Sequence, residues 1–133
     1  MASACAVWDF TTGDSRRFCD RLQLILDTAE TFRRQGVAPE FVILLHAQAT
    51  QFGARTLAGT KFEGRDAAAD LSAPHALLAR FAELGGTIQV CGIAMERSAI
   101  APDNVIDCAT VERNVFVTAV ALQNRGYAYM QIS

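Results

Sequence analysis

The sequence predicts an α/β protein in which a mainly parallel sheet lies between layers of helices. Short apolar runs alternate with amphipathic stretches along all 133 residues, and this order implies right-handed crossovers between parallel strands. Hydrophobic residues make up 51% of the chain and charged residues 20%, so the chain can build a core of its own. We therefore expect one three-layer domain over residues 1–133, with helices on both faces of the sheet.

The first part of the chain predicts a strand, a long amphipathic helix and a second strand. The apolar run Cys5–Phe10 predicts the first strand. The helix after it is expected to begin at Asp14 or Ser15 and to end at Gly36. Its apolar residues recur at steps of three and four and are Phe18, Leu22, Ile25, Ala29 and Phe32. The run Phe41–His46 is apolar until its last residue, as is typical of a parallel strand covered on both faces.

The segment from Gln51 to Asp70 is rich in glycine and charged residues, and it predicts a loop with one short helical turn. A loop of this length inside a compact domain often serves as a lid or a binding segment. A solvated connector is the alternative, and the sequence does not separate the two.

Helices and strands alternate again after this loop. Ser72 and Pro74 mark the start of an amphipathic helix that ends at Gly85. Thr87–Cys91 predicts the third strand, and a short helix is expected after Gly92 in the stretch "IAMERSAI".

A strand, a helix and a last strand complete the chain. The stretch Cys108–Glu112 predicts a weaker fourth strand. Asn114 is placed to cap a helix that ends at Gly126, and "YAYMQI" has the alternating pattern of a fifth strand.

Composition and motifs exclude several classes of protein. The formal net charge is −2 with acidic and basic residues interleaved, so nucleic acid is not an expected partner. No apolar run approaches the roughly 18 residues that span a bilayer, and the first residues do not resemble a secretion signal, so we expect a cytoplasmic protein with no membrane partner. Glycine-rich nucleotide motifs are absent, and His46 and His75 stand at no ligand spacing from the cysteines, so we expect neither a cofactor nor a metal.

Cys91 is the main candidate for chemistry. It ends the third predicted strand, and ligands in open α/β sheets bind at the carboxyl ends of the strands. Gly92 allows a sharp turn, and the amides of a helix that begins there favour the thiolate, which is the reactive form of cysteine. The alternative is a packed side chain, since free cysteines are commonly buried. Cys5 and Cys108 lie near strand starts, at the opposite edge of the sheet.

His46 is the second candidate because it also ends a strand. Parallel neighbours lie about 4.8 Å apart, whereas one intervening strand would separate His46 and Cys91 by roughly 10 Å. The residues alone do not set the strand order. Trp8, Asp9 and Thr11 end the first strand and can line the same crevice, although strand and turn roles also explain them.

Three stretches are distinctive in their order and spacing: "FVILLHAQA", "GGTIQVCGIAM" and "ALQNRGYAYMQI". They resemble the DsrE/DsrF-like family, whose members include sulfur-relay proteins, and the resemblance extends from about Cys5 to Ile132. It implies a five-stranded sheet of order 4-3-2-1-5, in which the strands that end at His46 and Cys91 are neighbours. It also implies homo-oligomers, commonly trimers or hexamers.

The resemblance also implies a function. In sulfur-relay members of the family, a cysteine just after the third strand carries sulfur as a persulfide, and Cys91 matches that position. The first hypothesis is therefore a small sulfur carrier or sulfurtransferase that accepts sulfane sulfur on Cys91. His46 and the amides of Gly92 and Ile93 would assist, and the partners would be sulfur donor and acceptor proteins.

Two other hypotheses remain open. In the first, the protein is a non-catalytic oligomeric module that binds a small ligand in the strand-end crevice. In the second, it is a structural or regulatory subunit in which Cys91 is only packed. In the binding module, Arg55, Lys61 or Arg97 would meet an anion. The candidate ligand-binding residues are Gly92, Ile93, Thr11 and Arg97.

Overall fold

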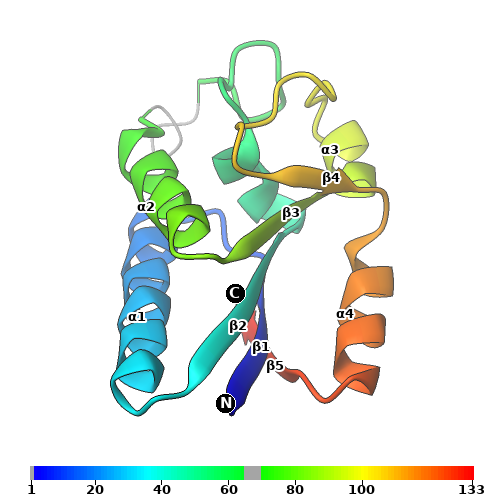
Figure 1. The fold of residues 1–133 in the computed structure, drawn as a ribbon. Helices are drawn as coiled ribbons and strands as arrows, with labels where there is room; N and C mark the ends of the chain where they lie inside the picture. Colours follow the sequence, from blue (N-terminus) through cyan, green and yellow to red (C-terminus); the bar gives the residue numbers. More distant parts are fainter. Residues whose placement is uncertain (1, 65–69) are drawn as a thin grey trace.

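The computed structural model describes residues 2–64 and 70–133 and contains a five-stranded sheet between helical layers (Figure 1). The strands follow the order β4-β3-β2-β1-β5, and every pairing is parallel. They are β1 (Ser3–Phe10), β2 (Ala38–Leu45), β3 (Thr87–Cys91), β4 (Thr110–Glu112) and β5 (Ala128–Ile132). The predicted fold class and strand order are confirmed.

Helices cover both faces of this sheet (Figure 1). α1 (Ser15–Arg34) and α2 (Ser72–Glu83) pack side by side on one face, and α4 (Val115–Asn124) lies on the other. α3 (Gly92–Arg97) and the 3₁₀ helix η1 (Ala47–Gly53) follow directly after β3 and β2, at the carboxyl edge of the sheet. No helix in the described ranges has both the length and the apolar character needed to cross a membrane.

Capping residues set the starts of α1 and α4. The Asp14 side chain accepts a hydrogen bond from the Arg17 amide at the start of α1, and the Asn114 side chain accepts one from the Phe116 amide at the start of α4. Gly36 follows α1 with a φ of 75°, a backbone conformation that only glycine adopts without strain. The predicted starts of both helices and the stop after α1 are therefore confirmed.

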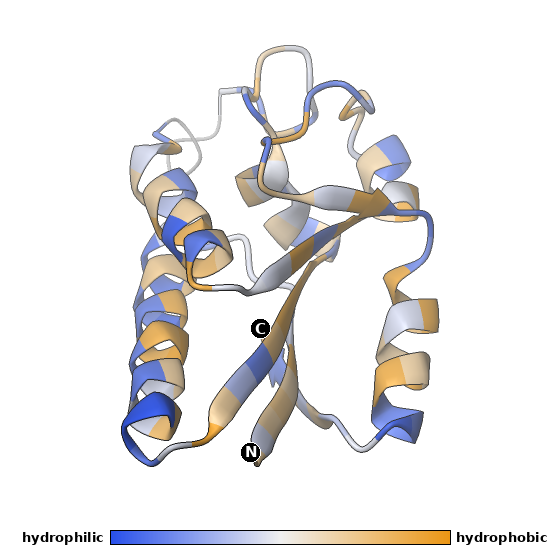
Figure 2. Cartoon of the chain, in the orientation of Figure 1, coloured by the Kyte–Doolittle hydropathy of each residue, from blue (hydrophilic) through white to orange (hydrophobic). Residues whose placement is uncertain are grey.

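Alternation along the strands sends side chains into two apolar clusters, one on each face. Along β1, Ala6 and Phe10 pack on the α1 and α2 side, whereas Val7 packs under α4. β2 changes from mixed residues at its amino end to hydrophobic residues at its carboxyl end, where it lies between the helical layers (Figure 2). The sheet, covered by helices on both faces, thus gives rigid support to the residues that follow its strand ends.

The strand bounds differ from the predicted ones where hydrogen bonding decides them. β1 and β2 begin earlier than their apolar runs because Ser3 pairs with Ala38, and the Ala38 amide donates to the Ala2 carbonyl at 2.9 Å. β4 is shorter than Cys108–Glu112 because pairing with β3 begins only at Thr110. Backbone pairing therefore sets where a strand begins and ends, and the hydrophobicity of the sequence does not mark these positions.

The segment after β2 departs most from the predicted polar loop. It contains η1, in which the Phe52 side chain is buried, and further along the chain Leu57 and Phe62 are buried as well. Phe52 stacks on Phe18 of α1 with 4.2 Å between ring centroids. Single apolar residues among polar ones have no helix or strand period, so the pattern did not reveal their burial. The part of the predicted loop at residues 65–69 lies outside the described residues.

Candidate functional site

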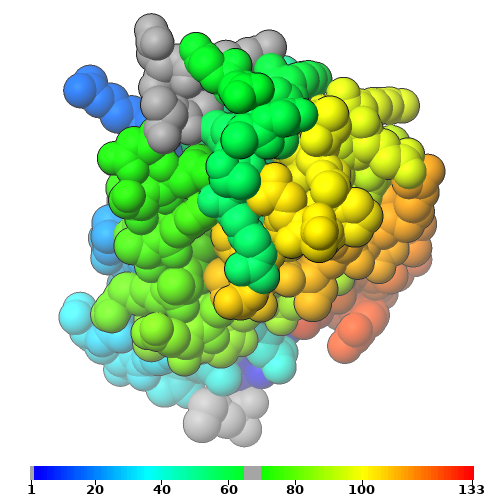
Figure 3. All heavy atoms as spheres, turned by 90° about the horizontal axis from the view of Figure 1, so that it is seen from above, coloured from blue at the N-terminus to red at the C-terminus, as the bar shows by residue number. Residues whose placement is uncertain are grey.

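A cavity of about 360 Å³ lies at the carboxyl edge of the sheet. The end of β2, the junction of β3 with α3, and the first turn of α4 enclose it, and Lys61 reaches it from the segment after η1. That segment pairs with the chain after α3, since the Lys61 amide donates to the Ser98 carbonyl at 3.0 Å and Ala54 bridges Val105. Seen from above, the two segments lie side by side in green and yellow over this edge (Figure 3).

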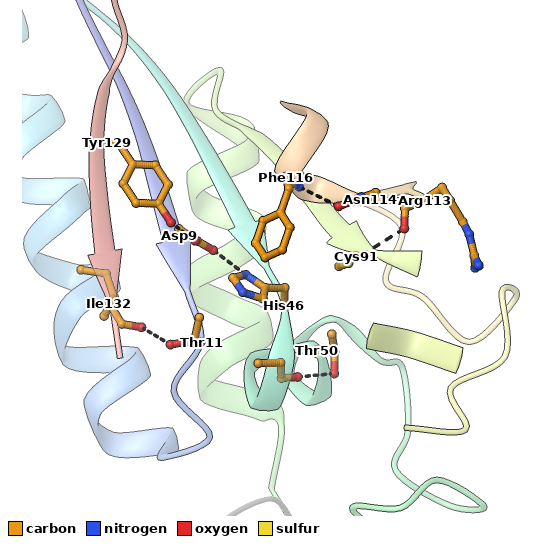
Figure 4. A network of polar contacts seen from close by, with 11 residues as sticks. Asp9, Thr11, His46, Thr50, Cys91, Arg113, Asn114, Phe116, Tyr129 and Ile132 are labelled. Carbon is orange, nitrogen blue, oxygen red and sulfur yellow. Dashed lines mark hydrogen bonds and ion pairs between the residues drawn. The ribbon is translucent and has the colours of Figure 1, made fainter. Parts of the chain in front are cut away.

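Polar and sulfur side chains form a row across adjacent strands on the α4 face of the sheet (Figure 4). In strand order they are Cys91 at the end of β3, His46 directly after β2, Asp9 on β1 and Tyr129 on β5. The register aligns Leu45 with Val90, so His46 and Cys91 are the next residues on two neighbouring strands. Because side chains alternate and parallel strands lie about 4.8 Å apart, both point to the same face at the same level. Both line the cavity.

His46 is held in one orientation by its neighbours. Its Nδ1 lies 2.6 Å from Oδ1 of Asp9, whose side chain is only 2% exposed. The Tyr129 hydroxyl donates to the other oxygen of Asp9. The Phe116 ring meets the imidazole edge to face, with 5.6 Å between centroids and 78° between planes. The ring of His46 is therefore held by Asp9 within the row and by Phe116 from α4.

The hydrogen bonds also assign the proton of the imidazole. The Tyr129 hydroxyl donates to one oxygen of Asp9, and Nδ1 of His46 lies within hydrogen-bond distance of the other. A carboxylate can only accept, so Nδ1 is the donor in this contact. The hydrogen of a neutral His46 ring is then on Nδ1, and Nε2 keeps its lone pair. Since Nδ1 is engaged with Asp9, Nε2 is the nitrogen left to take a proton from a group in the cavity.

Cys91 is buried in the sheet's α4-side cluster but forms part of the cavity wall. Its residue exposure is 7%, and its Sγ lies 4.0 Å from the Arg113 carbonyl, which is a weak contact. The Ile93 amide donates to the same carbonyl at 3.0 Å, so that amide is already engaged. A Cβ on Gly92 would come within 3.1 Å of the Arg113 Cα, so the turn from β3 into α3 packs closely against the chain before α4. A reagent reaches the thiol through the cavity.

The other three thiols all have raised pKa values. Burial raises the pKa of Cys19 and of Cys108, and a hydrogen bond to Glu40 raises the pKa of Cys5. Cys19 and Cys108 pack against the cluster on the α1 and α2 side, and Cys5 lies near the start of β1. Cys91 is thus the one cysteine among the described residues that lines the strand-end cavity.

The structure brings some predicted ligand residues to the cavity and leaves others away from it. Ile93, Arg97 and Lys61 line it, whereas Gly92 lies in the buried turn behind it. Thr11 is elsewhere, because its amide and hydroxyl both bond the Ile132 carbonyl, at 2.9 and 3.5 Å.

Two more predicted residues lie outside this site. Arg55 pairs with Asp107 beyond the cavity. Trp8 faces the opposite side of the sheet, where its ring packs edge to face on Phe41.

Sequence reasoning missed two parts of this site. Asp9 was a candidate only for lining the crevice, not for holding His46, and Tyr129 was not a candidate at all. One signal was available for Asp9, since a charged residue inside the apolar run "CAVWDF" is unusual and requires a partner. No comparable signal marks Tyr129, because a tyrosine is ordinary in a strand. Within residues 2–64 and 70–133 no group of histidine, cysteine or acidic side chains is arranged to hold a metal ion.

The raised pKa of Tyr129 makes the stability of the fold depend on pH. Burial raises the pKa of Tyr129 to about 12, and the hydrogen bond to Asp9 adds to the shift. An unfolded tyrosine ionises near pH 10, so between about pH 10 and 12 the folded state holds more protons than the unfolded state. The stability from this group is complete below about pH 10 and is lost as pH rises toward 12.

Replacing Tyr129 with phenylalanine tests this dependence. We expect the difference in unfolding free energy between the wild type and Tyr129→Phe to shrink when urea titrations move from about pH 9 to about pH 11. Tyr127→Phe is the comparison variant: burial also raises the pKa of Tyr127, but no hydrogen bond to Asp9 adds to that shift, so we expect the same trend to be weaker. A difference that stays constant with pH would show that Tyr129 ionises equally in both states.

The fold and the site define a class: small α/β proteins with a parallel five-stranded sheet and a cysteine-bearing cavity beyond its strand ends. The sequence matches the DsrE/DsrF-like family over residues 18–132, and the chain belongs to that family. Among solved structures it is similar to MTH1491 from Methanobacterium thermoautotrophicum, a protein of unknown function. The TM-score is 0.75 at 11% identity, over 98% of this chain and 99% of the other, which shows a shared fold alone. No curated protein matches the sequence.

Proposed function

We propose that this protein is a sulfur carrier that accepts sulfane sulfur as a persulfide on Cys91. The observation that carries the proposal is the placement of Cys91 and His46 at the ends of neighbouring strands, on the wall of one cavity, with His46 oriented by a buried Asp9. Membership of the DsrE/DsrF-like family supports a role of the sulfur-relay type. A cysteine beside an oriented imidazole is the arrangement that activates a thiol.

The proposed step transfers one sulfur atom from a donor R–S–SH. The Nε2 lone pair of His46 accepts the thiol proton of Cys91, and the resulting thiolate attacks the outer sulfur of the donor. The S–S bond of the donor breaks, an S–S bond forms on Cys91, and the departing R–S⁻ takes the proton from His46. The products are the Cys91 persulfide and R–SH, so no external oxidant or reductant is needed.

Two further properties belong to the proposal. All four cysteines are free thiols, which suits work in the reducing cytoplasm. A carrier also requires partners, and we place a sulfur donor before it and an acceptor thiol after it. Because Cys91 is reached through a cavity, each partner must present its sulfur on a small molecule or a narrow segment.

The test is mass spectrometry after incubation with a low-molecular-weight persulfide, under conditions that preserve persulfides. We expect the wild-type protein to gain the mass of one sulfur atom, on the peptide that contains Cys91. Cys91→Ser should gain none. Cys5→Ser is the matched control and should load like the wild type, because a hydrogen bond to Glu40 raises the pKa of Cys5 and makes it a poor nucleophile.

Other outcomes would contradict the proposal. If Cys5, Cys19 and Cys108 gain sulfur as readily as Cys91, the site confers no reactivity. If a folded wild-type protein gains no sulfur from a competent donor, the cavity serves a non-catalytic binding module instead, and the experiment becomes a search for its ligand.

We also propose that the chain forms a homo-oligomer through α4. The outer side of this helix is apolar, and Phe116, Val117 and Val120 are 61%, 61% and 58% exposed. A helix that is apolar on all sides is normally buried, so this surface requires a cover. Phe116 belongs both to this surface and to the cavity wall, so a second copy on α4 would also border the site.

A further inference from the structure

The cavity beside Cys91 has an unbalanced positive charge. Lys61 and Arg97 line it, and no aspartate or glutamate among the described residues does. Neither cation has an ion-pair partner in the part of the chain that the structure describes, although Lys61 lies 5.6 Å from the Phe62 ring centroid. The chain as a whole has a net charge of −2, so this local excess runs against the overall balance.

The fold brings the two cations to the same side of the cavity. They come from different segments, and the hydrogen bond from the Lys61 amide to the Ser98 carbonyl ties Lys61 next to the end of α3, where Arg97 lies. By contrast, the nearby Arg113 is neutralised by Glu96 at 2.8 Å. The first turn of α4 also borders the cavity, and the amino end of a helix carries partial positive charge.

The rest of the lining sets the size and character of the ligand. Ile93, Val115 and Phe116 form apolar walls, and Gln48 and Asn114 add neutral polar groups. The volume of about 360 Å³ is at the small end of the range for ligand pockets. The space therefore fits a compact molecule with a short apolar body and an anionic group.

We infer that the cavity selects small organic persulfides that carry carboxylate groups, with Lys61 and Arg97 binding the carboxylates while the sulfur end faces Cys91. The inference rests on the proposed function, because it names the donor for the same thiol. The reaction is the balanced exchange given above, with a carboxylate on the group R. The thiol R–SH that leaves after transfer keeps the same carboxylates and is therefore a ligand for the same cations.

Binding of the product thiols tests this without any sulfur transfer. The Cys91→Ser protein is titrated by NMR with 2-mercaptosuccinate, 3-mercaptopropionate and 2-mercaptoethanol, which carry two, one and no carboxylates. We expect affinity to fall in that order. In the Cys91→Ser background, Lys61→Gln or Arg97→Gln should weaken mercaptosuccinate binding about tenfold each, the usual size for a hydrogen bond to a charged group. The double variant should lose the preference among the thiols.

Arg80→Gln is the matched control, since Arg80 is an exposed arginine of α2 on the other face of the sheet. It should leave every affinity unchanged. Equal binding of the three thiols, or no binding of mercaptosuccinate, would overturn the inference. Because these titrations use Cys91→Ser, their result does not depend on sulfur loading. If the wild-type protein loads sulfur but the cavity shows no preference for carboxylates, only the inference is wrong. If the cavity binds carboxylates but the wild-type protein does not load sulfur, only the proposed function is wrong.

Discussion

Replacing His46 with alanine is expected to slow the loading of sulfur onto Cys91 by about 10²–10⁴-fold, the usual contribution of a positioned general base. The reason is that His46 and Cys91 line the same cavity and Nδ1 of His46 is engaged with Asp9, which leaves Nε2 as the nitrogen that can accept the thiol proton. The rate is measured as persulfide formation in a single turnover, quenched and analysed by mass. Loading at the wild-type rate in a folded His46→Ala protein would show that His46 is only a structural residue.

Asp9→Asn separates the orientation of His46 from its presence. The amide has nearly the volume of the carboxylate but can donate a hydrogen bond to Nδ1, which then leaves the hydrogen on Nε2 and removes the free lone pair. We expect sulfur loading to slow by a large part of the His46→Ala effect and its pH profile to change. Tyr129→Phe is the milder companion, since it removes only the second hydrogen bond to Asp9 and leaves the Asp9–His46 contact in place. Equal rates of sulfur loading in the wild type and in Asp9→Asn would show that the Asp9–His46 pair does not affect the reactivity of the Cys91 thiol.

Val117→Lys is expected to convert the proposed homo-oligomer into monomers. Val117 projects from the apolar outer side of α4, and an unpaired ammonium buried in an apolar interface is strongly destabilising. Sedimentation velocity measures the change directly, as a fall in molecular mass. The folded monomer should persist, because Val117 is exposed in the single chain and does not contribute to its core.

Leu24→Lys is the control for this prediction. Leu24 is an apolar residue of α1 that is 52% exposed on the opposite face of the sheet, so it matches Val117 in character and exposure. The oligomer should survive this change. If Leu24→Lys dissociates it and Val117→Lys does not, the interface is on the α1 side. A wild-type protein that is monomeric at all concentrations would remove the oligomer proposal.

Much of the fold could be predicted because local patterns determine it. The apolar stripe from Phe18 to Phe32 has the period of a helix, Asp14 and Asn114 are capping residues, and the runs that end at His46 and Cys91 have the character of covered strands. Each of these signals is contained within a few residues. The order of the strands came from the family resemblance, not from any such pattern.

The sequence by itself therefore determined the alternation of strands and helices and the position of Cys91 and His46 at strand ends. Only the tertiary structure decided that Asp9 and Tyr129 complete a row with them, that Phe52 belongs to the core, and that Lys61 and Arg97 line the same cavity. The physical reason is distance along the chain. Periodicity and capping act over a few neighbouring residues, whereas these contacts join segments whose approach depends on strand order, register and crossover geometry.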